Sequence, residues 1–448
     1  MLDFNLVLAV LGGVAILLIL ILRFKIQAFI SLLIASVFVG VFSGMPPKEI
    51  ITTMQQGMGG TLGFVALVVG LGAIFGSILE QSGGAEALAN YLLSKFGDKR
   101  ASWALMLTGF LVAIPVFFDV AFIILIPLVY SLQRRTKKSL LLYAIPLLAG
   151  LAITHSFIPP TPGPVAVSDI LKADLGWVIL FGFIVGVPTA VVCGPIFANY
   201  IANKIHIEAP KLSSDTTEIQ NYPAVRLIIM IIGIPIVLIV ANTLLNSPLI
   251  GEDLVSQNVK DWIGMIGNPF IALIIANLIA WYVLGIKRGL SKDELLKIAT
   301  NSMAPAGLII LLTGAGGVFK QMLVNTGTGE MLANYFSTIG IGVLFFGFFI
   351  AVLVRILQGS ATVAMITAAG VTAPLLIRAD LSEPSKALLV IAVASGASIM
   401  SHVNDSGFWL VGKYLGLTEK QTFKSWTVMT TILALTSFTI ITILSLLV

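Results

Sequence analysis

The chain has 448 residues, of which 58% are hydrophobic and only 10% are charged, and its mean hydropathy is +1.04. These values exclude a soluble globular protein, because they lie far outside the usual composition of that class. Apolar runs of about 20 residues recur along the chain, and each is long enough to cross the ~30 Å hydrocarbon core of a bilayer. They predict an all-α polytopic membrane protein embedded in a lipid bilayer.

The net charge of +5 does not indicate nucleic acid as a partner, because the basic residues of a membrane protein collect in its cytoplasmic loops. The single cysteine, Cys193, excludes an intramolecular disulfide and a cysteine-based metal cluster. The motifs GxxxxGK[ST], HExxH and GxSxG are absent, so neither an ATP-driven pump nor a membrane hydrolase is expected. We predict a protein that is not an enzyme and that needs no cofactor or metal.

The first two spans are predicted at residues 4–22 and 27–44. Arg23 and Lys25 separate them, and basic loops face the cytoplasm, so the N-terminus is expected on the outside. The first apolar run lacks a basic n-region and a cleavage site, and we interpret it as a retained helix. The C-terminus is also expected outside.

The apolar run at 101–133 has unusual flanks. The segment before it, "SKFGDKR" (94–100), and the segment after it, "RRTKK" (134–138), are both basic. Because both flanks favour the cytoplasm, the run is predicted to turn back as a re-entrant hairpin with its tip near "PVFFDV" (115–120). A single tilted and kinked helix is the alternative.

A proline-rich segment interrupts the following span. "IPPTPGP" (158–164) cannot continue a helix, because each proline removes a backbone donor and clashes with the preceding turn. A broken helix is therefore predicted. A polar linker then divides the chain, which gives a first unit at 1–203, a cytoplasmic linker at 204–223 and a second unit at 224–448.

The second unit resembles the first. Residues 72–91 and 316–335 share 9 identities in 20 aligned positions. Continuing this alignment sets Asp119 opposite Ser360 and places "THSFIPPTPGP" opposite "SHVNDSGFW", so that His155 faces His402. Each unit has five predicted crossings and one hairpin, and an odd number of crossings inverts the second copy. Inverted repeats with discontinuous helices are typical of secondary transporters, whose substrate site lies at the repeat interface.

Asp119 lies at the tip of the first predicted hairpin. An ionised carboxylate is costly inside a membrane, so it must face water, find a partner or hold a proton. We interpret Asp119 as a proton carrier, with a cap on the turn as the alternative. His155 is a second candidate for proton coupling, because histidine titrates near neutral pH. A structural role is the alternative for this histidine.

The second unit supplies the other candidates. Asp405 is expected to couple protons or to bind substrate, beside the polar residues Asn404 and Ser406 and near His402. The start of the helix within "QGSATVA" (358–364) is expected to attract an anion. Arg355 is expected either to bind a substrate carboxylate or to pair with Asp119 or Asp405. Further candidate substrate contacts are Gly359, Ser360 and Thr362 in the second half, and Thr161 and Gly163 in the first.

The sequence resembles the gluconate permease family of proton symporters, within the wider ion transporter superfamily. The resemblance is carried by "GGTLGF" (59–64), "FFDVAFIILIPLV" (117–129), "GAGGVFKQ" (314–321), "QGSATVA" (358–364) and "SHVNDSGFWLV" (401–411). It implies proton-coupled uptake of gluconate or a related sugar acid across a bacterial inner membrane. The superfamily fold implies a scaffold domain and an elevator-like transport domain.

One position departs from the pattern of that family. Its members commonly read PPHPGP where this chain has "PPTPGP", so Thr161 replaces a histidine by a group that cannot carry a proton at neutral pH. The expected partners are a small anionic sugar acid and protons, and a homodimer is a further expectation. A sodium-coupled carboxylate transporter and a proton symporter for D-serine or glycerate are the alternatives. A ligand sensor or channel is the alternative from another class.

Overall fold

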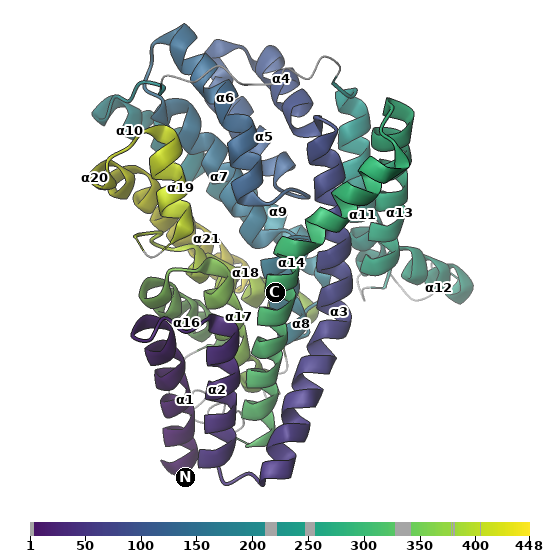
Figure 1. Ribbon diagram of the computed structural model, residues 1–448, viewed down its shortest axis with the longest axis vertical. Coiled ribbons are helices and arrows are strands. Elements are labelled where there is room, and N and C mark those ends of the chain that lie inside the picture. Colours follow the sequence, from purple (N-terminus) through teal and green to yellow (C-terminus); the bar gives the residue numbers. More distant parts are fainter. Residues whose placement is uncertain are drawn as a thin grey trace.

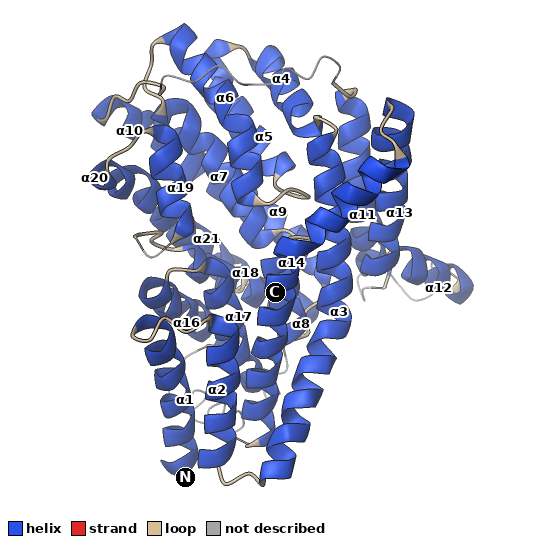
Figure 2. Ribbon diagram, viewed as in Figure 1, coloured by secondary structure: helices blue, strands red, loops and turns tan. Residues whose placement is uncertain are grey.

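The computed structural model describes residues 4–210, 222–246, 256–327, 342–377, 379, 381–403 and 405–448. Within these ranges every regular element is helical and no strand is present (Figure 2). Seven helical segments of the described chain are long and apolar enough to cross a membrane. The all-α membrane fold that the composition predicts is confirmed. Most of the predicted linker at 204–223 falls outside the described residues.

The first half of the chain contains two helical interruptions, one between α5 and α6 and one between α7 and α8. Its helices are α1 (Phe4–Leu22), α2 (Ala28–Phe42), α3 (Pro47–Gln81), α4 (Gly84–Phe96), α5 (Ala101–Val112), α6 (Phe118–Thr136), α7 (Leu141–Phe157), α8 (Pro162–Leu171), α9 (Leu175–Val191) and α10 (Phe197–Lys204).

The second half contains two corresponding interruptions, between α16 and α17 and between α18 and α19. Its helices are α11 (Val225–Leu245), α12 (Gln257–Ile266), α13 (Pro269–Ala280), α14 (Lys292–Asn325), α16 (Val343–Gln358), α17 (Ala361–Thr372), α18 (Glu383–Ser398), α19 (Ser406–Leu415), α20 (Glu419–Thr422) and α21 (Val428–Leu444), with a π-helical turn η7 (Phe423–Thr427) before α21.

The two longest helices, α3 and α14, pack against each other and run together through the molecule (Figure 1). Small residues permit this contact. A Cβ atom on Gly57 would lie 2.7 Å from the carbonyl oxygen of Gly317, and one on Gly317 would lie 2.1 Å from the hydroxyl of Thr61. Because helices in lipid associate mainly through close packing, these glycines hold the pair together.

The run at 101–133 turns back on itself, as its two basic flanks predicted. Helix α5 ends at Val112 and α6 begins at Phe118, and Asp98, before α5, forms an ion pair with Arg135, at the end of α6. The turn packs against α3, where a Cβ on Gly76 would lie 1.9 Å from the carbonyl oxygen of Pro115. The predicted tip and the turn coincide.

The second hairpin is formed by α16 and α17. Gly359 ends α16 with φ +91°, a conformation that favours glycine, and Ser360 caps the start of α17. A Cβ on Gly347, in the first turn of α16, would lie 3.6 Å from the side chain of Thr372, the last residue of α17. The two helices are therefore antiparallel neighbours.

Each hairpin packs closely on a broken helix. A Cβ on Gly150 of α7 would lie 2.2 Å from the carbonyl oxygen of Met106 in α5. In the second half, a Cβ on Gly396 of α18 would lie 2.4 Å from the carbonyl oxygen of Phe348 in α16. The two broken helices meet where their first parts end, because the hydroxyl of Ser398 donates to that of Ser156 at 3.1 Å. All four interruptions are thereby brought to one region.

Candidate functional site

A cavity of about 540 Å³ lies where the hairpin tips and the broken helices meet. Its size is within the usual range for sites that bind small molecules. Eight residues selected from the sequence line it, from both halves of the chain. They are Asp119, His155, Arg355, Gly359, Ser360, Thr362, Asp405 and Ser406.

Three selected residues do not line this cavity. The buried hydroxyl of Thr161 donates to the carbonyl oxygen of Ile158 at 2.6 Å. This local hydrogen bond stabilises the turn between α7 and α8. Gly163 lies against Met365, whose sulfur would be 2.8 Å from an added Cβ. A ring nitrogen of His402 lies 2.9 Å from the carbonyl oxygen of Ile356. Asn404 lies outside the described residues.

Arg355 and Asp405 form an ion pair within the second half. Arg355 Nη2 lies 2.6 Å from Asp405 Oδ2, and the side chain of Arg355 is only 4% exposed. Arg355 also donates to the carbonyl oxygen of Ile399 at 3.2 Å and to that of Gly359. One side chain therefore joins the tip of the second hairpin to both sides of the second broken helix. Of the alternatives for Arg355, the pair with Asp405 is the one formed.

Asp405 accepts hydrogen bonds on both carboxylate oxygens. Oδ1 accepts from the backbone N–H of Gly407 at 3.1 Å, which makes Asp405 the N-cap of α19. Oδ2 accepts from Arg355 and from the hydroxyl of Ser401. All three partners are donors, so this environment suits an ionised carboxylate.

Asp119 has a different environment. It is the second residue of α6, its side chain is exposed to the cavity, and the described part of the chain provides it with no hydrogen bond or ion pair. Asp119 is not the N-cap of α6, because that position is Phe117, whose side chain makes no cap hydrogen bond. Because the charges of Arg355 and Asp405 cancel, Asp119 carries the uncompensated charge among the cavity's described residues.

The sequence alignment sets Asp119 opposite Ser360, and the structure corrects this register. Ser360 is the N-cap of α17, whereas Asp119 is the second residue of α6, the position that Thr362 occupies in α17. The turn between α5 and α6 is longer than the two-residue turn of the second hairpin, and this displaces an alignment based on sequence alone. His155 and His402 are also not equivalent, because His155 lies within α7 and His402 lies in an interruption.

His155 approaches the cavity from α7. Its ring lies 6.3 Å from that of Phe117, centroid to centroid, in an edge-on arrangement. Its Nδ1 is buried and has no hydrogen-bond partner in the described structure. A buried polar atom without a partner is costly, so this nitrogen is available to a bound molecule or to water.

Three helices begin at the cavity: α6, α17 and α19. Their N-terminal N–H groups and dipoles favour negative charge. Side chains already cap two of them, since Ser360 accepts from Val363 N–H at 3.4 Å and Asp405 accepts from Gly407. Helix α6, which begins after Phe117, has no side-chain cap. The cavity thus combines an open helix N-terminus with hydroxyl groups on the other walls.

Other residues that line the cavity were not selected from the sequence. Pro305 and Ile309 come from the middle of α14, while Trp426 and Thr430 come from η7 and α21. The duplicated motifs include neither segment, so the repeat did not indicate them. A proline within a long helix and a tryptophan in an otherwise apolar run were the available signals.

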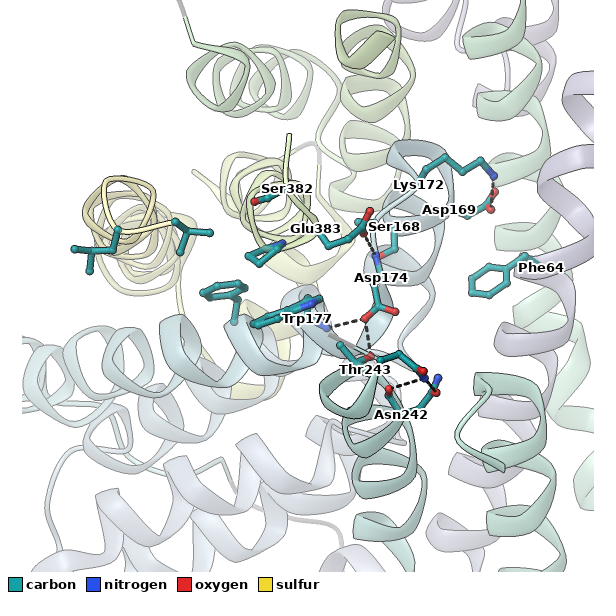
Figure 3. Close-up of a pocket in the computed structure, with 16 residues that line it drawn as sticks. Phe64, Ser168, Asp169, Lys172, Asp174, Trp177, Asn242, Thr243, Ser382 and Glu383 are labelled. Carbon is teal, nitrogen blue, oxygen red and sulfur yellow. Dashed lines mark hydrogen bonds and ion pairs between the residues drawn. The ribbon is translucent and has the colours of Figure 1, made fainter. Parts of the chain in front are cut away.

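A second pocket, of about 1020 Å³, lies at the start of α9 (Figure 3). Several of its polar groups are engaged with one another, although Asp169 Oδ2 is buried without a hydrogen-bond partner in the described structure. Asp174 accepts from the hydroxyl of Thr243 at 2.7 Å and donates its backbone N–H to Glu383 at 3.2 Å, and Lys172 Nζ lies 3.0 Å from Asp169 Oδ1. None of the residues selected from the sequence lines this pocket. The smaller cavity, between the interrupted helices, is therefore the candidate site.

A multi-pass helical membrane protein with an internal cavity between interrupted helices, lined in part by polar and charged side chains, is a membrane transport protein rather than an enzyme. The sequence matches the family described as "GntP family permease" over residues 4–447. The chain belongs to this family.

Similar proteins agree with this assignment. The chain is 39% identical to the low-affinity gluconate transporter of Escherichia coli K12, over 97% of this chain and 96% of that protein. It is 40% identical to the gluconate permease of Pseudomonas aeruginosa, over 96% of this chain and 95% of that protein. Among solved structures, the YdaH transporter of Alcanivorax borkumensis has a similar fold, with a TM-score of 0.62, 17% identity and 88% coverage of both chains.

Proposed function

We propose that this protein is a proton-coupled importer of gluconate or a related sugar acid in a bacterial inner membrane. Two relatives that match almost the whole chain carry gluconate in their names, which supports the substrate class. The interrupted helices of the two halves support alternating access by inverted repeats, with the second half inverted relative to the first. By analogy with the superfamily, the movement is elevator-like.

The observation that carries the proposal is the charge balance of the cavity. Arg355 and Asp405 neutralise each other, and Asp119 faces the cavity without a partner in the described chain. A substrate anion beside an ionised Asp119 would place two negative charges close together in one cavity, where they repel each other. Protonation of Asp119 removes one of them. Binding of the anion and binding of a proton are therefore linked, which is the requirement for symport.

The remaining groups suit a polyhydroxylated anion. The uncapped N-terminus of α6 offers backbone N–H groups to the carboxylate. Thr362 and Ser406 offer hydroxyls, and His155 offers its unpaired Nδ1. Ser360 and Asp405 hold the helix starts in place, so we assign them mainly to the shape of the site. We assign proton coupling to Asp119.

Uptake into proteoliposomes tests this proposal. Purified protein is reconstituted, an inward proton gradient is imposed, and labelled gluconate is followed in buffers that contain either sodium or choline. We expect accumulation in both buffers and its loss when a protonophore dissipates the gradient. Strict dependence on sodium would replace the proton model by the sodium-coupled alternative.

The same uptake assay also tests which substrates the protein accepts. Unlabelled gluconate, glycerate, other sugar acids and D-serine compete with the labelled substrate at equal concentration. Because the hydroxyls of Thr362 and Ser406 suit a polyhydroxylated substrate, we expect sugar acids to compete best. If only D-serine competed, the protein would be a D-serine symporter and not a sugar-acid importer. If the labelled substrate equilibrated without accumulating, the protein would be a channel.

A further inference from the structure

Trp426 occupies a central place that the proposed mechanism does not yet use. It lies in the π-helical turn η7, is 3% exposed and lines the cavity. Its ring lies 5.7 Å from that of Phe118, the residue directly before Asp119. Single π-helical turns within helices often occur at functional sites. The indole therefore lies between the tip of the first hairpin and the second broken helix.

A chain of two hydrogen bonds connects Trp426 to Asp405. The indole Nε1–H donates to the hydroxyl of Ser401 at 2.6 Å, and this hydroxyl donates to Asp405 Oδ2. An indole N–H can only donate, and a serine hydroxyl has a single proton. With one lone pair of the hydroxyl occupied by Trp426, the proton of Ser401 is directed to Asp405.

Ser401 is itself fixed by the same helix. It is fully buried, its backbone N–H donates to the hydroxyl of Thr430 at 3.1 Å, and its carbonyl oxygen accepts from the hydroxyl of Thr427. Irregular backbone at membrane depth is stable only when its polar groups find partners. The η7 turn and helix α21 thus supply partners for the second interruption and set the position of Ser401.

The consequence concerns the ionisation of Asp405. The charged and titratable side chains that share the cavity with it are Asp119, His155 and Arg355. Arg355 and the Ser401 hydroxyl both donate to Oδ2, and a protonated Asp405 would lose part of both interactions. The Trp426 N–H strengthens the Ser401 bond, because successive hydrogen bonds polarise one another.

We propose that Trp426 is a positioning residue that keeps Asp405 ionised as the partner of Arg355, so that proton uptake in the cavity is confined to Asp119. This inference deepens the proposed function, because it assigns one carboxylate to the proton and the other to the structure. It also explains why two carboxylates in one cavity have separate roles.

Infrared spectroscopy of the full-length protein in lipid tests this assignment without a substrate. A protonated carboxyl group has a carbonyl band that a carboxylate lacks, and acid-minus-alkaline difference spectra between about pH 8 and pH 5 report which groups gain protons. Ordinary exposed carboxyls remain mostly ionised in this range, and their small contribution is common to all variants. We expect the Asp119→Asn variant to lose a band of the wild-type spectrum and the Asp405→Asn variant to keep it.

The decisive variant is Trp426→Phe, which keeps an aromatic ring beside Phe118 and removes the N–H. We expect it to gain a second carboxyl band, which disappears when Asp405→Asn is added. Ser401→Ala should produce the same new band, and combining it with Trp426→Phe should add nothing further, because both act through one chain. A Trp426→Phe spectrum identical to that of the wild type would overturn the inference, as would loss of the wild-type band in Asp405→Asn.

Trp409→Phe is the matched control. Trp409 donates its Nε1–H to the carbonyl oxygen of Val403 at 2.8 Å, at the same interruption but outside the chain to Asp405. We expect its spectrum to match that of the wild type. The thermal unfolding midpoint of each variant checks folding. Gluconate uptake by the wild type tests the proposed function separately, so either conclusion can fail without the other.

Discussion

Arg355 and Asp405 are 50 residues apart in the chain, yet their side chains lie 2.6 Å apart and connect two interruptions of the second half. The pair places a positive charge inside the candidate site without leaving it available as a simple anion receptor. Asp119 then determines the net charge of the cavity. This relationship underlies the separate roles that we propose for the two carboxylates, and it leads to the following predictions.

Replacement of Arg355 by alanine should destabilise the protein strongly. The change leaves Asp405 largely buried without its counter-ion, and breaking a buried pair in this way typically costs about 3–5 kcal/mol. The thermal unfolding midpoint in detergent should fall, and uptake should be lost. An unchanged midpoint would show that the pair does not stabilise the second half.

Arg355→Lys distinguishes charge from geometry. Lysine keeps the positive charge but lacks the fork that reaches Ile399, Gly359 and Asp405 together. We expect a lower unfolding midpoint than that of the wild type and impaired uptake. Full activity in this variant would mean that charge alone is sufficient at this position.

Close packing of the first hairpin on α7 can be tested with one methyl group. In Gly150→Ala the new Cβ would lie 2.2 Å from the carbonyl oxygen of Met106, so α5 and α7 must separate. We expect a lower unfolding midpoint and reduced uptake. Gly63→Ala is the control, because nothing lies within 4 Å of an added Cβ there and alanine favours the helix. Equal midpoints for the two variants would contradict the packing account.

We expect the larger pocket at the start of α9 to affect the stability of the protein and not the binding of substrate. Thr243→Val removes a hydroxyl that donates to Asp174 while keeping nearly the same volume. Loss of one such hydrogen bond should cost about 1 kcal/mol of stability and leave the KM for gluconate unchanged. A severalfold change in KM with normal stability would indicate that this pocket takes part in transport.

Uptake by the wild type should depend on external pH in a defined direction. In the proposed coupling the anion binds together with a proton on Asp119, so lower external pH increases the protonated fraction, and the apparent affinity for gluconate should rise as pH falls. Asp119→Asn removes the proposed proton acceptor, so the pH dependence of binding should become much weaker and proton-driven accumulation should be lost. Equal pH dependence in the two proteins would assign the proton to another group.

Several features of the fold were predictable because they leave local signals in the sequence. Two basic flanks around residues 101–133 require the chain to turn back, and the prolines of residues 158–164 require a break. The duplicated motifs also drew attention to Asp119, Ser360 and Asp405, and all three line the same cavity. These signals depend on charge, proline chemistry and repetition, all of which can be read without coordinates.

Other features required three-dimensional geometry. The sequence left open whether Arg355 binds substrate or a carboxylate, since the choice depends on the packing of α16 against α18. Thr161 belongs to a conspicuous motif, yet its hydroxyl turns to the carbonyl of Ile158 and not to the cavity. Trp426 and Pro305 reach the cavity from helices outside the duplicated motifs, so only the folded structure brings them there.

The central claim is that binding of the anion and protonation of Asp119 are linked, and proton uptake on binding measures this directly. Gluconate is added to purified protein in weakly buffered solution containing a pH indicator, at a pH where the free protein has Asp119 ionised. The account predicts that up to one proton is taken up for each anion bound by the wild type, and none by Asp119→Asn. Binding by the wild type without proton uptake, or equal proton uptake by the variant, would contradict it.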